Sequence, residues 1–175
     1  MNQSGALLRI EIYSDVICPW CYVGKRRLER ALGQLEDRVK AQISWRPFQL
    51  NPTMPEEGMD RTLYLRAKFG SLDAFGQMKE HLLAAGVEEQ IPFAFEKVLR
   101  TPNTFLAHRL IRYGEQQGCQ DAVVESLFRG YFAEGSDIGS VPVLGQLAGR
   151  AGLDVAAVES FLHSEEGTTE GKAEE

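Results

Sequence analysis

Cysteine and histidine are scarce in this sequence, with three of each among 175 residues. Only Cys18 and Cys21 lie close together, and there is neither a second CxxC motif nor a pair of histidines at zinc-finger spacing. A structural zinc site usually needs four such ligands, and recruiting Cys119 with a histidine would require distant segments to converge. We therefore expect no metal site and no other cofactor.

An excess of basic residues is also missing. The 19 Lys and Arg residues stand against 25 Asp and Glu residues, which gives a formal net charge of -6. This balance argues against a nucleic acid or an anionic membrane recognised by bulk charge. No apolar run approaches a membrane span, and the N-terminus lacks the basic start and apolar stretch of a secretory signal. We therefore expect a cytoplasmic protein, in which closely spaced cysteines indicate catalysis, redox sensing or metal binding.

What the sequence does contain is a CxxC motif at the junction of two patterns. Residues 7–13 (LLRIEIY) alternate apolar and polar side chains, which predicts a strand with one buried face. From Pro19 onward, PWCYVGKRRLERALGQL has the spacing of an amphipathic helix. Cys18 is therefore expected at the N-terminus of this helix, with Pro19 in the first helical position, where no N–H donor is needed.

This position suits a reactive thiol, because the thiolate and not the thiol attacks disulfides. Unpaired backbone N–H groups and the helix dipole stabilise a negative sulfur at a helix N-terminus. We predict that Cys18 is the nucleophile and that its pKa is lowered. Cys21 follows one turn later on the same side, so we predict that it resolves the mixed disulfide formed at Cys18.

A second strand is predicted over residues 41–50, with Ile43, Trp45 and Phe48 as its apolar anchors. Pro47 cannot donate to a strand ladder, so the pairing is expected to end or bulge there. Strand, helix and strand make a βαβ unit, which is expected to be parallel.

The rest of the chain has apolar residues at helical spacing. Gly70, Gly86 and Gly118 are expected to end three of the helices. Helices are predicted over residues 60–69, 71–85, 104–117, about 121–132, 141–151 and 154–163. We divide the chain into a βαβ portion with the CxxC motif (1–52), a helical insertion (53–163) and an acidic tail predicted to be disordered (164–175).

Several segments together resemble the DsbA-like thioredoxin-fold proteins, in particular their cytosolic FrnE-type branch. These segments are SDVICPWCYVGK (14–25), WRPFQLNP (45–52), RTPNT (100–104), AHRL (107–110) and QDAV (120–123). Agreement over so much of the chain is far more specific than a lone CxxC. It implies an α/β fold, in which a thioredoxin-like βαβ unit carries a large all-helical insertion. It also implies a disulfide oxidoreductase that uses Cys18 and Cys21.

The family pattern continues further than this sequence does. In the family, the insertion is followed by a linker helix, a loop with a cis-proline beside the cysteines, two antiparallel strands and a final helix. None of these is recognised before Glu175, so the last two strands and the final helix are expected to be absent from this chain. A two-stranded sheet with one crossover helix should be marginal alone, and a second chain could supply strands in an oligomer.

The resemblance implies exchange with protein or small-molecule thiols and disulfides, glutathione among them. In such enzymes the dipeptide between the cysteines, here Pro19 and Trp20, tunes the relative stability of dithiol and disulfide. One alternative is a glutathione-using protein like the kappa-class transferases and 2-hydroxychromene-2-carboxylate isomerases. These resemble the same fold, but they typically keep a serine near the first cysteine position and lack the second cysteine. The other alternative is a non-catalytic thioredoxin-like binding or chaperone module.

Four other residues have both a structural and a functional interpretation. Asp15 is a turn residue or influences thiol ionisation, and we favour the turn. Lys25 follows Cys21 by one helical turn, but a solvated lysine is the simpler interpretation. His108 lies between apolar residues on a helix and is expected to be structural. Cys119 has no neighbouring cysteine, so we interpret it as a lone thiol without a catalytic role.

Overall fold

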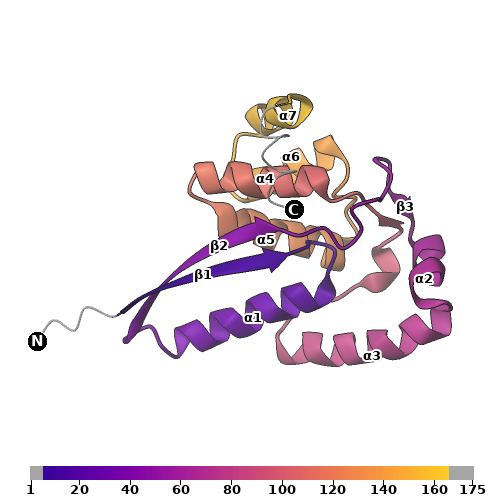
Figure 1. Ribbon diagram of the computed structural model, residues 1–175, viewed down its shortest axis with the longest axis horizontal. Helices are drawn as coiled ribbons and strands as arrows, with labels where there is room; N and C mark the ends of the chain where they lie inside the picture. Colours follow the sequence, from indigo (N-terminus) through magenta and orange to yellow (C-terminus); the bar gives the residue numbers. More distant parts are fainter. Residues whose placement is uncertain (1–5, 166–175) are drawn as a thin grey trace, which may run out of the picture.

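The computed structural model describes residues 6–165, and Figure 1 shows the arrangement of its elements. The strands are β1 (Ala6–Ser14), β2 (Val39–Pro47), β3 (Met59–Asp60) and β4 (Arg100–Thr101). The α-helices are α1 (Pro19–Gly33), α2 (Arg61–Phe69), α3 (Leu72–Glu88), α4 (Phe105–Gln116), α5 (Gln120–Arg129), α6 (Val141–Arg150) and α7 (Val155–His163). There are also a 3-10 turn, η1 (Phe95–Lys97), and a π-helical turn, η2 (Gly130–Glu134). None of the helices in the described range is long and apolar enough to cross a membrane. Most of the predicted acidic tail, from residue 166 on, lies outside that range.

β1 and β2 form the predicted parallel pair, with α1 as the connection between them. Ile12 lies opposite Trp45, and the pairing ends at Pro47, as the missing N–H of proline predicts. In the part of the chain that the structure describes, this sheet has two strands. Figure 1 shows α1 on one side of these strands and α4 on the other.

At Trp45, the side chain of Gln120 closes the outer edge of β2. The Gln120 amide accepts a hydrogen bond from the Trp45 N–H at 2.9 Å and donates one to the Trp45 carbonyl at 3.0 Å. It therefore occupies backbone groups that a neighbouring strand would otherwise use. The Trp45 indole N–H also donates to the Asp121 carboxylate at 3.0 Å. These bonds fasten the start of α5 to the strand.

One hydrophobic core joins the βαβ unit to the helices. Tyr22 on α1 stacks on Phe128 of α5 with ring centroids 4.9 Å apart, and its hydroxyl donates to Glu125 at 2.9 Å. Phe132 continues the stack and meets Phe93 edge to face at 5.5 Å. The same core includes residues of β2 and of helices α3 to α7. The domain boundary after β2 stays a prediction, and the core extends across it.

The two strands are less buried than their alternation predicts. Leu8 is 44% exposed, and Ile10 and Ile12 are only partly buried. Among residues 6–165, β1 has a neighbouring strand on one side. Trp45 is buried as predicted. Phe48 is not the predicted core anchor, since it follows the end of β2 and is 51% exposed.

Most predicted helix ends are confirmed. Gly70 and Gly118 have φ angles of 79° and 75°, which glycine adopts without strain, and they follow α2 and α4. Gly86 does not end α3, which continues to Glu88. The last predicted turn near residue 132 is π-helical, although both of its apolar rows are buried. Those rows are Val123, Leu127 and Tyr131, and Val124, Phe128 and Phe132.

The structure adds a short antiparallel pair that the sequence does not predict. β3 and β4 pair over only two residues each, too few for a periodic pattern. Nearby, the Asn103 amide donates to the Met54 carbonyl at 2.7 Å. These contacts hold the loop after β2 against the segment that leads into α4.

We expect Gly86→Ala to destabilise the protein, although alanine is the better helix former. The added Cβ would lie 2.6 Å from the Phe93 ring, and overpacking of this kind typically costs about 1–3 kcal/mol. Gly76, in the same helix, faces open space. Gly76→Ala should therefore raise the free energy of unfolding by about 0.5–1 kcal/mol. Urea unfolding measures both changes, and a stabilising Gly86→Ala would contradict the packing role of this glycine.

Candidate functional site

The CxxC motif lies where β1 leads into α1. Cys18 is the N-cap residue of α1, with an extended backbone (φ -92°, ψ 109°), and Pro19 begins the helix, both as predicted. The Cys18 N–H donates to the Asp15 carbonyl at 3.0 Å, which closes the turn before the helix. The Cys21 N–H donates to the Cys18 carbonyl at 3.1 Å. Both cysteines therefore sit half-buried at the first turn of α1.

The two thiols hydrogen bond to each other, and this bond has the largest effect on their acidity. It lowers the pKa of Cys21 to about 6 and raises the pKa of Cys18 above its usual range. Because the two sulfurs share one proton, the lowered value describes the first ionisation of the pair. The predicted lowering of the pKa of Cys18 is not confirmed, because the interaction with Cys21 raises it.

Other donors lie around both sulfurs. The backbone N–H groups of Cys21 and Trp20 favour a negative Cys18, which is the effect expected at a helix N-terminus. After the interaction between the two thiols, the nearby Ser14 hydroxyl and Asp15 backbone N–H lower the pKa of Cys21, although the Ser14 Oγ has no hydrogen-bond partner within the described residues. Ser14 is a contributor that the sequence pattern does not reveal, because it is the last residue of a strand. Either sulfur therefore has donors for a negative charge.

Asp15 is wholly buried and does more than shape the turn. Its carboxylate accepts hydrogen bonds from the Leu50 N–H at 2.8 Å and the Ile17 N–H at 3.5 Å. The turn is thereby tied to the loop after β2. The negative charge of Asp15 raises the pKa of Cys21, against the larger lowering by the Cys18 thiol. The turn role is confirmed, and the influence on the thiols is present as well.

His108 on α4 faces the same carboxylate. Its Nε2 lies 3.5 Å from Asp15 Oδ1, and the residue is only 7% exposed. Within residues 6–165, Nε2 makes no hydrogen bond. The sequence predicts a structural histidine in a separate insertion, whereas α4 brings it beside the CxxC turn.

Lys25 is buried, so the predicted solvated side chain is wrong. It is 3% exposed, and its ammonium lies 3.1 Å from the Asp121 carboxylate and 3.3 Å from that of Glu125, and also pairs with Glu29. Burial opposes its charge, but hydrogen bonds and charges from Glu29 and Asp121 hold the pKa of Lys25 above its usual value. Lys25 therefore fastens α1 to α5.

Cys119 is the N-cap residue of α5, and all three cysteines are free thiols. Its interpretation as a lone thiol stays a prediction. Across the described residues, no three His, Cys, Asp or Glu side chains form a group that could hold a metal ion.

Trp20 and Pro19 separate the two cysteines on the surface of the protein. The Trp20 side chain is 45% exposed, and Pro19 is partly exposed. Their tuning of the redox equilibrium stays a prediction.

A pocket of about 360 Å³ adjoins the loop that holds the CxxC turn. Three of its side chains form one polar group, in which Asn51 Nδ2 and Lys68 Nζ both donate to the Tyr64 hydroxyl, at 3.0 and 2.8 Å. The pocket is lined by Leu50, Asn51, Thr53, Met54, Pro55, Met59, Tyr64, Ala67 and Lys68. Leu50 donates its N–H to the Asp15 carboxylate, and the Asp15 carbonyl accepts the N–H of Cys18. Two hydrogen bonds through Asp15 therefore link the lining of this pocket to the CxxC turn.

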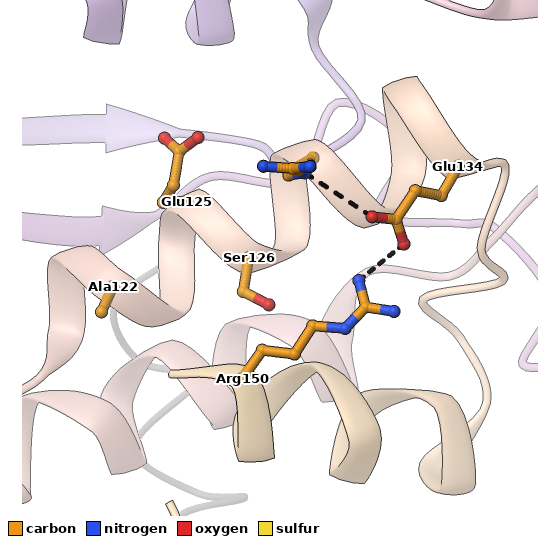
Figure 2. A pocket seen from close by; sticks show the side chains of 6 residues that line it. Ala122, Glu125, Ser126, Glu134 and Arg150 are labelled. Atoms are coloured by element: carbon orange, nitrogen blue, oxygen red, sulfur yellow. Dashed lines mark hydrogen bonds and ion pairs between the residues drawn. The ribbon is translucent and has the colours of Figure 1, made fainter. Parts of the chain in front are cut away.

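A second pocket, of about 470 Å³, lies between α5, η2 and α6 (Figure 2). It is lined by Ala122, Glu125, Ser126, Arg129, Glu134 and Arg150. The Glu134 carboxylate is 3.6 Å from the Arg129 guanidinium and 2.6 Å from that of Arg150, which Figure 2 shows turned toward it. Its lining holds no cysteine and its arginines are already paired, so we assign it no part in the dithiol site.

Fold and site together define a protein class. A thioredoxin-like βαβ unit carries a CxxC motif at the start of its helix, and a helical part of the chain packs against it. The chain belongs to the family of DSBA-like thioredoxin domains, whose family model matches residues 9–175. The predicted fold and its resemblance to DsbA-like proteins are confirmed, and the FrnE-type branch stays a prediction.

Two relatives are similar over most of this chain. A probable DsbA oxidoreductase from Streptomyces coelicolor is 31% identical, with a TM-score of 0.85 over 96% of this chain and 73% of that one. The uncharacterized protein YwbO of Bacillus subtilis (strain 168) is 29% identical over 157 residues, which are 90% of this chain and 72% of that protein.

More distant structures share the fold alone. A 2-hydroxychromene-2-carboxylate isomerase is 15% identical with a TM-score of 0.70, over 95% of this chain and 77% of that one. The cytosolic disulfide reductase DsbM from Pseudomonas aeruginosa is 18% identical with a TM-score of 0.66, over 95% of this chain and 74% of that one. DsbM has also been solved with GSH.

In a Cys119→Ser background, titration of the thiolate absorbance should give a first ionisation near pH 6, because the sulfur–sulfur hydrogen bond lowers the pKa of Cys21 to about 6. Cys18→Ala removes that hydrogen bond and should move the midpoint to higher pH. Cys21→Ala should lower the pKa of Cys18, since the hydrogen bond to Cys21 is the main cause of its raised value. A midpoint that stays near pH 6 in Cys18→Ala would contradict this assignment.

Proposed function

We propose that this chain is a thiol–disulfide oxidoreductase that works through Cys18 and Cys21. The observation that carries the proposal is the pair of free, half-buried cysteines at the first turn of α1. The lowered pKa of Cys21 supports it, because the thiolate is the species that attacks disulfides. Membership of the DSBA-like family supports the same chemistry.

Cys18 takes the attacking role in this proposal. It is the N-cap residue of α1, with the partly exposed Pro19 and the exposed Trp20 after it. Cys21 lies within the first turn, where the buried Ser14 and Asp15 act on it. We therefore assign the attack on the substrate to Cys18. When the shared proton moves to Cys21, the backbone N–H groups at the start of α1 remain as donors to a negative Cys18.

A substrate disulfide is reduced in two exchanges. In the first, the Cys18 thiolate attacks one substrate sulfur, a Cys18–substrate disulfide forms, and the other sulfur leaves as a thiolate and takes up a proton. In the second, Cys21 loses its proton and attacks the Cys18 sulfur, so that the Cys18–Cys21 disulfide forms and the second substrate sulfur leaves. Two electrons pass from the dithiol to the substrate. The reverse sequence oxidises a substrate dithiol.

Pro19 and Trp20 are proposed to set the balance between the dithiol and the disulfide. Pro19 has no N–H, so only later residues of the first turn can donate to Cys18. The N–H of Trp20 is one of these donors, and it favours the thiolate and hence the reduced state.

The proposed substrates are protein or small-molecule thiols and disulfides, glutathione among them, in the cytoplasm. The pocket lined by Leu50 supports a small charged substrate, because the Lys68 side chain is part of its lining and Leu50 is hydrogen-bonded to Asp15 of the CxxC turn. The structurally similar DsbM is described as cytosolic and was solved with GSH.

The isomerase alternative has weaker support. The isomerase with a similar structure shares only 15% of its residues, which relates the folds alone. A dithiol is also more than a glutathione-activating site needs, since one residue suffices to bind a glutathione sulfur. A purely non-catalytic module gives no reason for two hydrogen-bonded thiols with a lowered first ionisation.

Loss of either cysteine should separate the two exchanges. Cys18→Ala is expected to reduce insulin disulfides no faster than the buffer thiol alone, because no attacking sulfur remains in the first position. Cys21→Ala is expected to form the Cys18–substrate disulfide and stop there, which intact-mass measurement detects as an added substrate thiol.

Cys119→Ser is the matched control for these variants, because it removes a free thiol outside the CxxC motif. Its turnover should equal that of the wild type. Unchanged insulin reduction by Cys18→Ala would refute the proposed function.

Lys68→Ala tests the small-substrate part of the proposal. An exposed ion pair contributes roughly 0.2–1 kcal/mol, so KM for glutathione disulfide should rise about 1.4- to fivefold. KM for the uncharged hydroxyethyl disulfide should stay unchanged. Lys40→Ala, an exposed lysine of β2, is the control. Equal changes in KM for both disulfides would show that Lys68 does not bind a carboxylate of the substrate.

A further inference from the structure

β1 has one edge to which no strand is paired in the described part of the chain. The neighbouring strand shows which backbone groups lie on that edge. The Trp45 N–H and C=O groups point away from β1, because both bond to the Gln120 side chain. In a parallel pair, the residue opposite such a residue points its own groups inward, and Ile12 is opposite Trp45. The Ile12 backbone groups are therefore directed toward β2.

Successive residues of a strand direct their N–H and C=O groups to alternate sides. Since the groups of Ile12 face β2, the outer edge is formed by the backbone groups of Leu7, Arg9, Glu11 and Tyr13. A second β1 can bond to these groups in the antiparallel direction, in which opposite residues exchange two N–H···O bonds. Two identical strands pair in this way about a two-fold axis. The position of the axis decides which side chains meet.

A two-fold axis at Ile10 brings opposite charges together. Arg9 of one copy then lies directly opposite Glu11 of the other, and the symmetry gives this pair twice. Opposite charges in this position stabilise a strand pair, and like charges destabilise it. An axis at Arg9 or at Glu11 would place two like charges opposite each other. The charges of β1 therefore favour the register about Ile10.

The apolar side chains of β1 match in the same register. Leu7 lies opposite Tyr13 on the face that carries the charges, and these two side chains are 60% and 62% exposed. On the other face, Leu8 lies opposite Ile12, and Leu8 is 44% exposed. Apolar pairs across neighbouring strands add to the stability of a sheet. The register about Ile10 thus gives partners to the most exposed apolar side chains of β1.

The two charged side chains of this edge suit an identical strand. Arg9 is exposed, and within residues 6–165 it forms no ion pair. Glu11 Oε1 lies 3.2 Å from Nε of Arg46 on β2. In the pair about Ile10, the Glu11 carboxylate would lie between Arg46 of its own chain and Arg9 of the second copy. Charges of one sign on an edge strand would repel an identical strand, whereas the opposite charges of β1 complement it.

We propose that two copies of this chain form a dimer through their β1 strands, paired antiparallel about Ile10. The shared sheet then has four strands in the order β2, β1, β1 and β2, and more than two strands favour a stable sheet. Each CxxC turn follows the end of its own β1, so the two Cys18 residues lie at opposite ends of the central pair. The inference does not depend on the proposed redox function.

The charge pairs provide the test. In sedimentation velocity with a reductant present, the wild type should be a dimer that dissociates on dilution. Arg9→Glu places two glutamates opposite each other, and Glu11→Arg does the same with two arginines. Because each dimer contains the pair twice, either substitution should raise the dimer dissociation constant about tenfold or more. Arg66→Glu makes the same charge change as Arg9→Glu at an exposed residue of α2 and should leave this constant unchanged.

A mixture of the two weakened variants tests the register directly. In the mixed dimer, the introduced glutamate lies opposite the introduced arginine, and Glu11 of the first variant lies opposite Arg9 of the second. Both pairs again have opposite charges, so mixing should lower the dissociation constant by the factor by which the single substitutions raise it. Misfolded variants would not combine, which separates loss of the contact from loss of the fold.

Hydrogen exchange locates the contact. The Arg9 and Glu11 N–H groups should be protected above the dissociation constant and exchange freely below it. A monomer at every concentration would overturn the proposal, whether these groups exchange freely or are covered by another segment of the same chain. A dimer that neither substitution weakens, or a mixture that stays as weak as its components, would also overturn it, because the contact would then lie elsewhere.

Discussion

The stacking of Tyr22 on Phe128 is the contact on which the rest of the structure depends. Two parallel strands and one helix bury too little apolar surface to be stable alone, and α1 gains most of its core from the helical part of the chain. Lys25 adds ion pairs across the same interface, so the contact also compensates a buried charge. Because Cys18 is the N-cap residue of α1, the position of α1 on α5 fixes where the sulfurs lie relative to Asp15.

Features decided by neighbouring residues could be predicted from the sequence. The end of β1, the N-cap position of Cys18 and the first-turn proline depend on residues within one or two turns, and each was correctly located. The errors depend on partners far along the chain. Lys25 is buried against Asp121 of α5, and Gly86 lies within α3 at a point where the Phe93 ring leaves no room for a side chain. No pattern within α1 or α3 contains that information.

The candidate site shows the same division. Both cysteines and Asp15 are recognisable from the motif and its turn. Which of the two thiols has the lower pKa is not recognisable from the motif, because it depends on how the two cysteine side chains are oriented toward each other. His108 belongs to a segment that sequence reasoning assigns to a separate insertion, yet it touches the turn before Cys18. The helical part is therefore part of the chemical environment of the dithiol as well as its support.

The hydrogen bonds between the Gln120 amide and Trp45 make the two edges of the small sheet different. The Gln120 side chain occupies the outward N–H and C=O groups of Trp45, so no further strand can pair with β2 at that point. Among the residues that the structure describes, the outer edge of β1 has no such cover and keeps its backbone groups available for pairing. Any strand that joins this sheet, from this chain or from another, is thus steered to the side of β1. Since β1 leads directly into the CxxC turn, the open edge of the sheet and the two cysteines belong to one continuous segment of the chain.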